Sequence, residues 1–483
     1  MMLEAIADGW RISLTDERLP EIIDRLVDEM TQPQTVRATV KRLSAEEKEA
    51  LAFVAAQGQV KAHVLTRKYG QVRRLGAGRL EWEAAWRQPV SVAERLWFLG
   101  LIYRAYAVDG AYHGEFFAVP PEIRPILPAM QAVLPVFSVQ CGAQPSLVRD
   151  EQDALARDVF VVLSHLRNQD VRAKKGVLAK HELDRIRDRL TCTDPPRLLL
   201  LWRTCEQAGL VHGEEGMWQP TQRAAVWLRG DALSRQQMLF QSWLTDAGWN
   251  ELCAMPSVRC EDTGWQHDPV RAREALLDHL RKCPLGAWLE VDSLIGAIYE
   301  TDPDFLRPDG DYESWYIRDA QSGQYLVGFA SWGRVEGALI RYLLEHALFW
   351  LGIVALGHGQ EAESATVFRL TPTGTALLSG ETGQTSGEDR VPSQEPAGRI
   401  VLSSDLRILV PSAVNWYDRF LLERFAHWVE EHAGVARYTM DSRSVRRALS
   451  RGVTVRQIEA FLRRTTGKRM PIEVQRALKA WGA

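Results

Sequence analysis

The sequence lacks the features by which membrane, secreted and metal-binding proteins are recognised. Its longest apolar run, residues 347–356, is about half as long as a membrane-spanning helix requires. The first residues include Glu4 and Asp8 and form neither a basic region nor an apolar run. The six cysteines form no CxxC pair and no ligand spacing with histidine. We therefore expect a cytoplasmic protein with reduced thiols, no membrane contact, no metal and no other cofactor.

Catalytic signatures are equally scarce. The Gly467-Lys468 pair lacks the upstream glycine loop and the following hydroxyl residue of a GxxxxGK[ST] phosphate loop, and no acidic DExx sequence follows a buried strand. HExxH and GxSxG motifs are absent too. The acidic residues between 290 and 319, Asp304 among them, do not follow the order of a calcium loop and are expected in a solvated loop, with an electrostatic docking face as the second choice. The sequence thus predicts a chain that is not an enzyme.

What is present is a long chain of ordinary soluble composition. The 483 residues include 59 lysines and arginines against 62 acidic residues, a net charge of −3. At about 100–200 residues per domain, this length predicts three to four folding units. The near-neutral charge argues against a protein that coats nucleic acid along its whole surface, but it leaves room for local patches.

One pattern occurs three times along the chain. An amphipathic helical run ends at a glycine (Gly100, Gly209 and Gly352), and two short β-like stretches joined by a turn follow. Further helices are expected before each glycine, at 44–56, 60–69 and 90–99, at 156–167, 177–190 and 196–207, and at 270–282, 291–299 and 335–351. Three helices followed by a β-wing indicate diverged winged-helix-like modules. The predicted fold class is mainly α with small β-wings, in tandem modules followed by a small α+β domain.

The predicted domains follow from this pattern and from a change in composition near the end. Residues 379–398 are rich in Gly, Ser, Pro and acid without apolar periodicity, which is typical of a flexible linker. The C-terminal domain behind it is expected to contain a hairpin at 399–402 and 406–411, helices at 418–431, 442–450, 454–464 and 472–481, and a short strand at 438–440. The predicted domains are 1–135 (N-terminal helices and first module), 150–245 (second module), 265–378 (third module), 379–398 (linker) and 399–483 (C-terminal domain).

The C-terminal domain carries a family resemblance. The sequence runs through Arg437-Tyr438-Thr439, Ser444-Val445-Arg446-Arg447-Ala448-Leu449-Ser450-Arg451-Gly452, Ile458-Glu459-Ala460-Phe461-Leu462, Met470-Pro471 and Trp481. This order resembles the helicase-associated domain in the N-terminal region of XPB-type helicases and their bacterial relatives. The resemblance implies a DNA-repair or transcription setting, in which such domains bind partner subunits or nucleic acid beside a motor. Because this chain has no motor motif, helicase activity would have to come from another polypeptide.

The charge is polarised toward this domain. Between residues 437 and 479 there are 12 lysines and arginines against three acidic residues, a net charge of +9. Because the whole chain has a net charge of −3, the remaining residues carry −12. The candidate nucleic-acid-binding residues are Arg443, Arg446, Arg447, Arg451, Arg456, Arg463, Arg464, Lys468 and Arg469. Arg446 and Arg447 lie near an expected helix start, where backbone amides also favour anions. Such a cluster neutralises phosphates, docks on an acidic protein surface, or is a solvated helix face.

A second basic stretch runs from Lys61 to Arg104. Its candidate nucleic-acid-binding residues, placed among glycines, are Arg67, Lys68, Arg73 and Arg74. If the third helix of each of the first two modules reads a groove, the arginines facing it are Arg87, Arg95, Arg197 and Arg203. The run Leu198–Trp202 favours instead a helix buried on nearly all sides.

An aromatic cluster opens the C-terminal domain. Trp416, Tyr417, Phe420, Phe425 and Trp428 are expected on the apolar face of one helix, as core or partner-docking residues. The leading hypothesis is a non-enzymatic helicase-associated protein that binds DNA, a helicase, or a transcription or repair partner through its winged-helix modules and basic C-terminal domain. The alternative is a protein–protein interaction scaffold without nucleic-acid contact.

Overall fold

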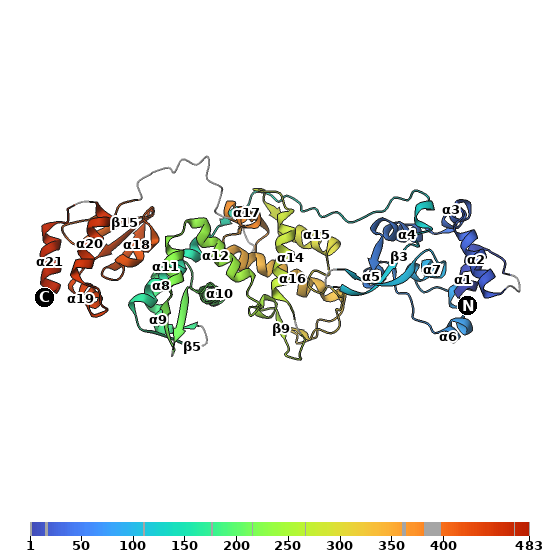
Figure 1. The fold of residues 1–483 in the computed structure, drawn as a ribbon, viewed down its shortest axis with the longest axis horizontal. Helices are drawn as coiled ribbons and strands as arrows, with labels where there is room; N and C mark the ends of the chain where they lie inside the picture. The colour runs from blue at the N-terminus through green and yellow to red at the C-terminus, as the bar shows by residue number, and fades with distance from the viewer. Residues whose placement is uncertain are drawn as a thin grey trace. The chain divides into compact units, whose positions relative to one another are not determined.

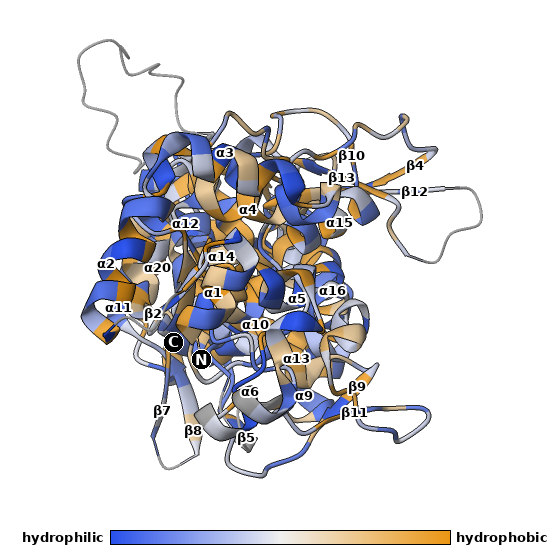
Figure 2. Ribbon diagram, turned by 90° about the vertical axis from the view of Figure 1, so that its right-hand side faces the viewer, coloured by the Kyte–Doolittle hydropathy of each residue, from blue (hydrophilic) through white to orange (hydrophobic). Residues whose placement is uncertain are grey.

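The computed structural model describes residues 2–14, 18–109, 112–174, 177–214, 216–265, 267–359, 364–380, 398–467 and 469–482. Within them helices predominate and the sheets are small and antiparallel, which confirms the predicted mainly α fold with small β elements. Figure 1 follows the elements from the blue N-terminus to the red C-terminus. Orange and blue residues alternate along many helices in Figure 2, as expected for amphipathic helices.

The chain divides into two compact units. The N-terminal unit comprises 1–137, 297–316 and 327–330, and the C-terminal unit comprises 138–296, 317–326 and 331–483. This division is coarser than the five predicted segments, which stay a prediction. The predicted linker falls almost wholly on 381–397, outside the described residues. No helix in the described parts of the chain is both long and apolar enough to cross a membrane.

The first repeat, residues 45–118, follows three N-terminal helices, α1 (Met2–Trp10), α2 (Leu19–Met30) and α3 (Pro33–Arg42). Its elements are α4 (Ala45–Gln57), β1 (Gln59–Lys61), α5 (Ala62–Tyr69), α6 (Ala77–Glu83), α7 (Val92–Phe98), β2 (Tyr103–Asp109) and β3 (Tyr112–Ala118). The strand order is β1-β3-β2, so the first strand joins the far side of the hairpin. Buried Leu51, Leu65 and Leu96 bring α4, α5 and α7 into one core.

The second repeat, residues 154–220, has a similar element order with an extra strand, β6, after the first one. It contains α8 (Ala154–Asn168), β5 (Val171–Lys174), β6 (Val177–Leu178), α9 (Lys180–Ile186), η3 (Arg187–Arg189), α10 (Pro195–Gln207), β7 (Val211–Glu214) and β8 (Met217–Pro220). Its sheet order is β6-β5-β8-β7. Two further helices, α11 (Gln222–Arg229) and α12 (Ala232–Leu244), follow it.

The third repeat, residues 269–370, is interrupted by an insertion. Its elements are α14 (Pro269–Arg281), β10 (Leu289–Glu290), α15 (Val291–Thr301), α16 (Trp332–Leu343), β12 (Val354–His358) and β13 (Val367–Leu370), followed by α17 (Pro372–Leu378). Strand β4 (Leu147–Arg149) extends its sheet to the order β10-β13-β12-β4. The insertion lies between α15 and α16. Its strand β11 (Ile317–Asp319) pairs with β9 (Val258–Cys260), which precedes α14, and its residues 302–316 belong to the N-terminal unit.

The three glycines that close the repeated pattern share one backbone conformation. Gly100, Gly209 and Gly352 have φ angles of 65°, 63° and 69°. A left-handed residue is the common way to end a helix, and glycine adopts it without a Cβ penalty. The predicted helix ends are confirmed, and in each repeat an antiparallel hairpin follows.

The described residues of the C-terminal domain form a four-stranded sheet with four helices. Its elements are β14 (Val401–Leu402), β15 (Arg407–Pro411), α18 (Trp416–Leu422), β16 (His427–His432), β17 (Val435–Thr439), α19 (Ser442–Ser450), α20 (Val455–Thr466) and α21 (Ile472–Gly482), with strand order β14-β15-β17-β16. Buried Ile408, Tyr438 and Leu462 connect sheet and helices in one core.

The helix predicted for 418–431 is wrong in its second half. Helix α18 ends at Leu422, and His427–His432 form the edge strand β16. Ala433 and Gly434 both have positive φ, 48° and 74°, as a two-residue hairpin turn requires. This turn pairs β16 with β17 and places Trp428 opposite Tyr438 in the sheet.

The expectation that all six cysteines are free thiols is also wrong. Cys253 and Cys260 form a disulfide, while Cys141, Cys192, Cys205 and Cys283 are free. The chain leaves α13 (Glu251–Ala254) and enters β9 within a few residues, which brings the two Cα atoms to 5.5 Å. That separation lies in the range a disulfide needs.

Candidate nucleic-acid interface

Helix α19 presents the exposed arginines of the C-terminal domain. Its apolar side is anchored by buried Val445 and Ala448, so Arg443 and Arg446, three residues apart, are exposed on the outer side. Within the described residues neither guanidinium has a carboxylate partner. The helix start is closed by the chain itself, because the Ser444 amide donates to the Asp441 carboxylate at 2.7 Å. The Asp441 carboxylate thus already accepts from one amide of the first turn and puts a negative charge at the helix start, which reduces the attraction of an anion expected there.

The next arginine of α19 is crowded by other cations. Arg447 is half-buried and donates to the Glu423 carbonyl at 3.5 Å, while its Nε has no hydrogen-bond partner in the described parts of the chain. Burial first, and then the charges of Arg451 and Arg443, lower the pKa of Arg447. Burial and the charge of Arg447 likewise lower the pKa of His427. A bound anion would relieve this repulsion.

The arginines of α20 differ from one another. Arg456 is exposed without a carboxylate partner in the described chain, whereas Arg464 forms a bidentate ion pair with Asp418 at 3.1 and 2.6 Å. Arg463 lies 3.8 Å from Glu459, one turn earlier. Arg469 is exposed beyond the helix, and Lys468 lies outside the described residues. The most available charges of α20 and the loop after it are thus Arg456 and Arg469.

The first-repeat candidates all face carboxylates. Arg67 forms a bidentate ion pair with Asp304 at 2.8 and 3.0 Å and lies 4.3 Å from the centre of the Phe329 ring. Asp304 also accepts from Tyr312 at 2.8 Å and is 3.0 Å from His63 Nε2. The Asp304 side chain is only 11% exposed, so the expectation of a solvated acidic loop is wrong for this residue.

The other three candidates of this stretch are paired too. Lys68 lies 3.5 Å from Glu49, Arg73 donates to buried Glu94 at 2.7 Å, and Arg74 lies 2.9 Å from Glu115. Of the three, Arg74 is the most exposed, at 74% of its side chain. Most basic residues of this stretch thus form ion pairs within the fold. Arg74 is the most accessible of them.

The third helix of the second repeat does not present its arginines to a groove. Arg197 is fully buried and pairs with Asp158 and with Glu151, the latter at 2.9 Å. Arg203 pairs with Asp246 through two contacts of 2.8 and 2.7 Å. The groove-facing hypothesis is wrong for Arg197. The burial expected of this helix is confirmed at Leu200, Leu201 and Trp202 but is wrong for Leu199, which is 36% exposed.

In the first repeat, Arg95 lies 3.2 Å from Glu47 and Arg87 is exposed in a short 3-10 helix. A groove contact by these two residues stays a prediction.

Residues of the second repeat and of the two helices after it contact part of the aromatic cluster of the C-terminal domain. Trp416 meets Phe160 and Trp227 edge-to-face, with ring centres 5.7 and 5.9 Å apart, and the Arg235 guanidinium lies 3.9 Å from the Trp416 ring centre. Arg229 lies 3.7 Å from the centre of the Tyr417 ring. The surface around Trp416 therefore docks within the chain.

The remaining members of the aromatic cluster lie in or beside the domain core. Phe420 is buried, Phe425 packs on Phe461 at 5.6 Å, and Arg189 of the second repeat lies 5.3 Å from the centre of the Trp428 ring. Docking of a separate partner on these aromatics stays a prediction.

No group of three or more metal-ligating side chains occurs in the parts of the chain that the structure describes. Arg189, Glu423 and Tyr438 form a charged network that the sequence did not predict. Arg189 comes from a different domain than Glu423 and Tyr438, so no sequence spacing relates it to them.

Comparison with protein families identifies one region. Residues 400–483 match the family described as helicase conserved C-terminal domain. The predicted helicase association is thereby confirmed for the C-terminal domain. No curated protein matches the chain.

Proposed function

We propose that this chain is a non-enzymatic, helicase-associated protein that binds DNA through the basic face of its C-terminal domain. The observation that carries the proposal is the exposed pair Arg443 and Arg446 on α19, beside the crowded cation Arg447. Arginine is the side chain best suited to phosphate, because its planar fork donates two hydrogen bonds at once. The positive charges in such a cluster repel one another, so a bound anion stabilises the cluster more than it stabilises an isolated surface arginine.

The proposal includes the three repeats as winged-helix modules. Each begins with a helix and a short strand, continues with two or more helices and ends in a hairpin, and the first strand pairs with the last one; the second repeat has an extra strand, β6, and the third has an insertion between its helices. This order supports the winged-helix assignment. The likeness of the C-terminal domain to XPB-type accessory domains supports a role in DNA repair or transcription beside a motor protein. The absence of a phosphate-loop motif from the sequence supports the view that the motor is another polypeptide.

The experiment is a salt titration of DNA binding. Fluorescein-labelled duplex and single-stranded oligonucleotides are titrated with the full chain from low to moderate salt, with anisotropy as the readout. For duplex DNA, log K is expected to fall linearly with log salt by about 0.9 per neutralised phosphate. R443E/R446E should weaken binding strongly and flatten this slope.

The matched control is R476E/K479E, which makes the same charge change on the exposed side of α21. It should keep most of the affinity. If R443E/R446E and the control lose affinity equally, only net charge matters and the α19 face is not the site. ATPase activity in a clean preparation would contradict the non-enzymatic part of the proposal.

A scaffold that binds an acidic protein is the second candidate. Arg464 and Arg451 of the same basic segment already pair with carboxylates, Asp418 and Asp170. Surfaces of this kind accept acidic proteins as well as phosphates. No detectable binding of either DNA form at low salt would favour the scaffold.

A further inference from the structure

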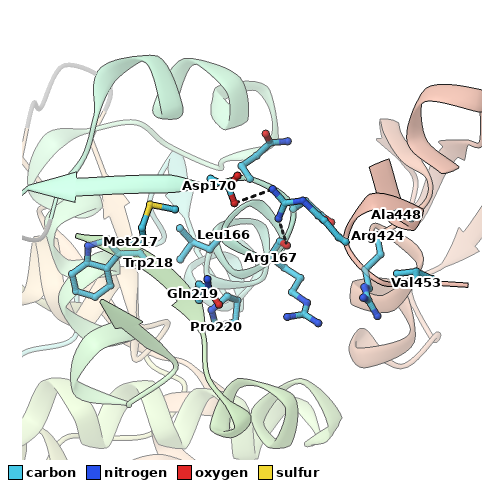
Figure 3. Close-up of a pocket in the computed structure, with 13 residues that line it drawn as sticks. Leu166, Arg167, Asp170, Met217, Trp218, Gln219, Pro220, Arg424, Ala448 and Val453 are labelled. Carbon is cyan, nitrogen blue, oxygen red and sulfur yellow. Dashed lines mark hydrogen bonds and ion pairs between the residues drawn. The ribbon is translucent and has the colours of Figure 1, made fainter. Parts of the chain in front are cut away.

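A groove lies within the C-terminal unit, where the C-terminal domain meets the second repeat. Its walls are the end of α8 with the following turn, strand β8, and residues of the C-terminal domain, and its volume is about 270 Å³. The residues that matter for its charge are Arg167, Asp170, Arg424 and Arg451. Figure 3 shows these walls, with Leu166 to Asp170 and Met217 to Pro220 on one side and Arg424, Ala448 and Val453 on the other.

One of the three arginines is used by the structure itself. Arg451 donates to the Asp170 carboxylate at 3.0 Å and to the Arg167 carbonyl at 3.3 Å, and so bridges the two walls. The carbonyl belongs to the last turn of α8, where the helix dipole favours a cation. The position of Arg451 is therefore explained without any ligand.

The other two arginines are not explained in this way. Neither Arg167 nor Arg424 has a carboxylate partner within the described residues, and in Figure 3 both side chains extend in the same direction. Three arginines against one aspartate leave the groove lining with a net charge of +2. Burial first, and then the charge of Arg167, lower the pKa of Arg424. The half-buried guanidinium of Arg424 is thus repelled by that of Arg167, which is exposed, and an anion beside Arg424 interacts more strongly than on an open surface.

Contacts between the second repeat and the C-terminal domain hold the two walls of the groove together. Glu423, the neighbour of Arg424, forms a bidentate ion pair with Arg189 of the second repeat at 3.0 and 2.6 Å. Trp416 packs on Phe160 of α8. These contacts hold Arg167 and Arg424 close without either taking part in the docking.

We propose that this groove binds a phosphate group of a nucleic-acid strand, held between Arg167 of the second repeat and Arg424 of the C-terminal domain. The inference rests on the proposed function and extends it, because it makes the second repeat and the C-terminal domain contact the same strand. Ala448 from the buried side of α19 and Arg451, which caps this helix, line the groove, so the groove lies at the C-terminal end of α19. A guanidinium fork from each wall gives a phosphate hydrogen bonds from two directions.

The test compares three double variants of the full chain in the same DNA titration. R167Q/R424Q removes the two guanidinium groups and should weaken binding about tenfold or more, with the slope of log K against log salt reduced by about 1 to 2. R187Q/R476Q removes the same charge from two exposed arginines outside the groove, one in each wall domain, and should bind nearly as wild type. R167K/R424K keeps the charge and should keep the salt slope with a smaller loss of affinity.

The outcomes separate this inference from the proposed function. If R167Q/R424Q binds DNA as wild type while R443E/R446E does not, the groove is not a phosphate site and the α19 face stands. If R443E/R446E binds as wild type or the wild-type chain binds no DNA, the proposed function itself fails, and the inference with it. Equal losses for R167Q/R424Q and R187Q/R476Q also overturn the inference. Matching circular dichroism melting curves for all variants confirm that each one folds.

Discussion

Arg189 and Glu423, which are 234 residues apart in the sequence, form a bidentate ion pair between the second repeat and the C-terminal domain. Their side chains are only 15% and 5% exposed. The Tyr438 hydroxyl donates to the same carboxylate at 2.7 Å, and Arg419 donates to Tyr438 at 2.7 Å. A buried charge with this many partners is costly to break, because the remaining partner stays in a site of low dielectric constant.

We expect E423Q to undock the C-terminal domain from the second repeat. The variant leaves Arg189 buried without a counter-charge, which costs about 3–5 kcal/mol, or a hundredfold or more in affinity between the two parts. A protease site introduced between residues 380 and 398 allows the connection to be cut. The fragments of the otherwise wild-type chain should then co-elute in size-exclusion chromatography, and those of E423Q should separate.

The matched control for E423Q is E430Q. Glu430 pairs with Arg437, but its side chain is 51% exposed, so its loss should cost less than about 1 kcal/mol and the fragments should stay together. R189Q breaks the same buried pair from the second repeat and should separate the fragments without changing the C-terminal domain. Co-elution of the R189Q fragments would contradict a docking role for this pair.

The repeats could be recognised from the sequence because helix ends and hairpins leave local signals. Gly100, Gly209 and Gly352 mark the helix ends, and each takes the left-handed conformation that few other residues adopt easily. The sequence does not separate strand β1 of the first repeat and strand β6 of the second from the helices that follow them, since Val60 and Val177 extend the apolar pattern. Two or three residues carry no period of their own, and their strand character comes from pairing, of β1 with the distant β3 and of β6 with β5.

The charges of the candidate site were visible in the sequence, but their pairing was not. Whether an arginine is free depends on which carboxylate the fold brings near it, as with Arg67 and Asp304 or Arg189 and Glu423. These partners are more than 200 residues apart, so no spacing rule finds them. Exposed arginines such as Arg443 can be separated from structural ones only after folding places the acidic residues.

The Cys253–Cys260 disulfide predicts a specific thiol count. A chain purified without reductant, denatured and alkylated should show four modified cysteines by mass spectrometry, and after reduction it should show all six. Peptide mapping should place the two protected thiols at Cys253 and Cys260. Six modified cysteines before reduction would contradict the pairing.

Arg197 should matter for stability and not for DNA binding. Among the described residues, R197M leaves the fully buried Asp158 carboxylate with the amide and hydroxyl of Thr191 as its remaining partners, so we expect a loss of about 3–5 kcal/mol in the free energy of unfolding of the second repeat. Denaturant unfolding measures this loss. The salt slope of DNA binding should not change where the variant remains folded.

R203Q is the control for R197M. Arg203 is 28% exposed in its pair with Asp246, so its loss should be smaller. A groove-reading role for the helix would give the opposite pattern, in which R197M weakens DNA binding while the unfolding free energy is kept.

Acid should loosen the insertion 302–316 from the first repeat through Asp304. Burial alone would raise the pKa of Asp304, but hydrogen bonds from His63 and Arg67 and the charge of Arg67 outweigh burial and hold the pKa far below its usual range. A carboxyl whose pKa is lowered by folding stabilises the folded state above its unfolded pKa, about 3.9, and this contribution is lost as the pH falls toward the folded pKa. Between pH 5 and pH 3, amide protection of 302–316 against hydrogen exchange, corrected for intrinsic rates, should therefore decline in the wild-type chain.

D304N separates this titration from general acid unfolding. At pH 7 the variant lacks the charged acceptor of Arg67, and we expect the insertion to open more easily by about 1.5–3 kcal/mol. Because asparagine does not titrate, the difference in protection between wild type and D304N should shrink as the pH falls below about 4. D109N is the control, since Asp109 is 58% exposed in its pair with Lys61 and should leave the protection of 302–316 unchanged. A difference between wild type and D304N that stays constant from pH 5 to pH 3 would show that the charge of Asp304 does not hold the insertion.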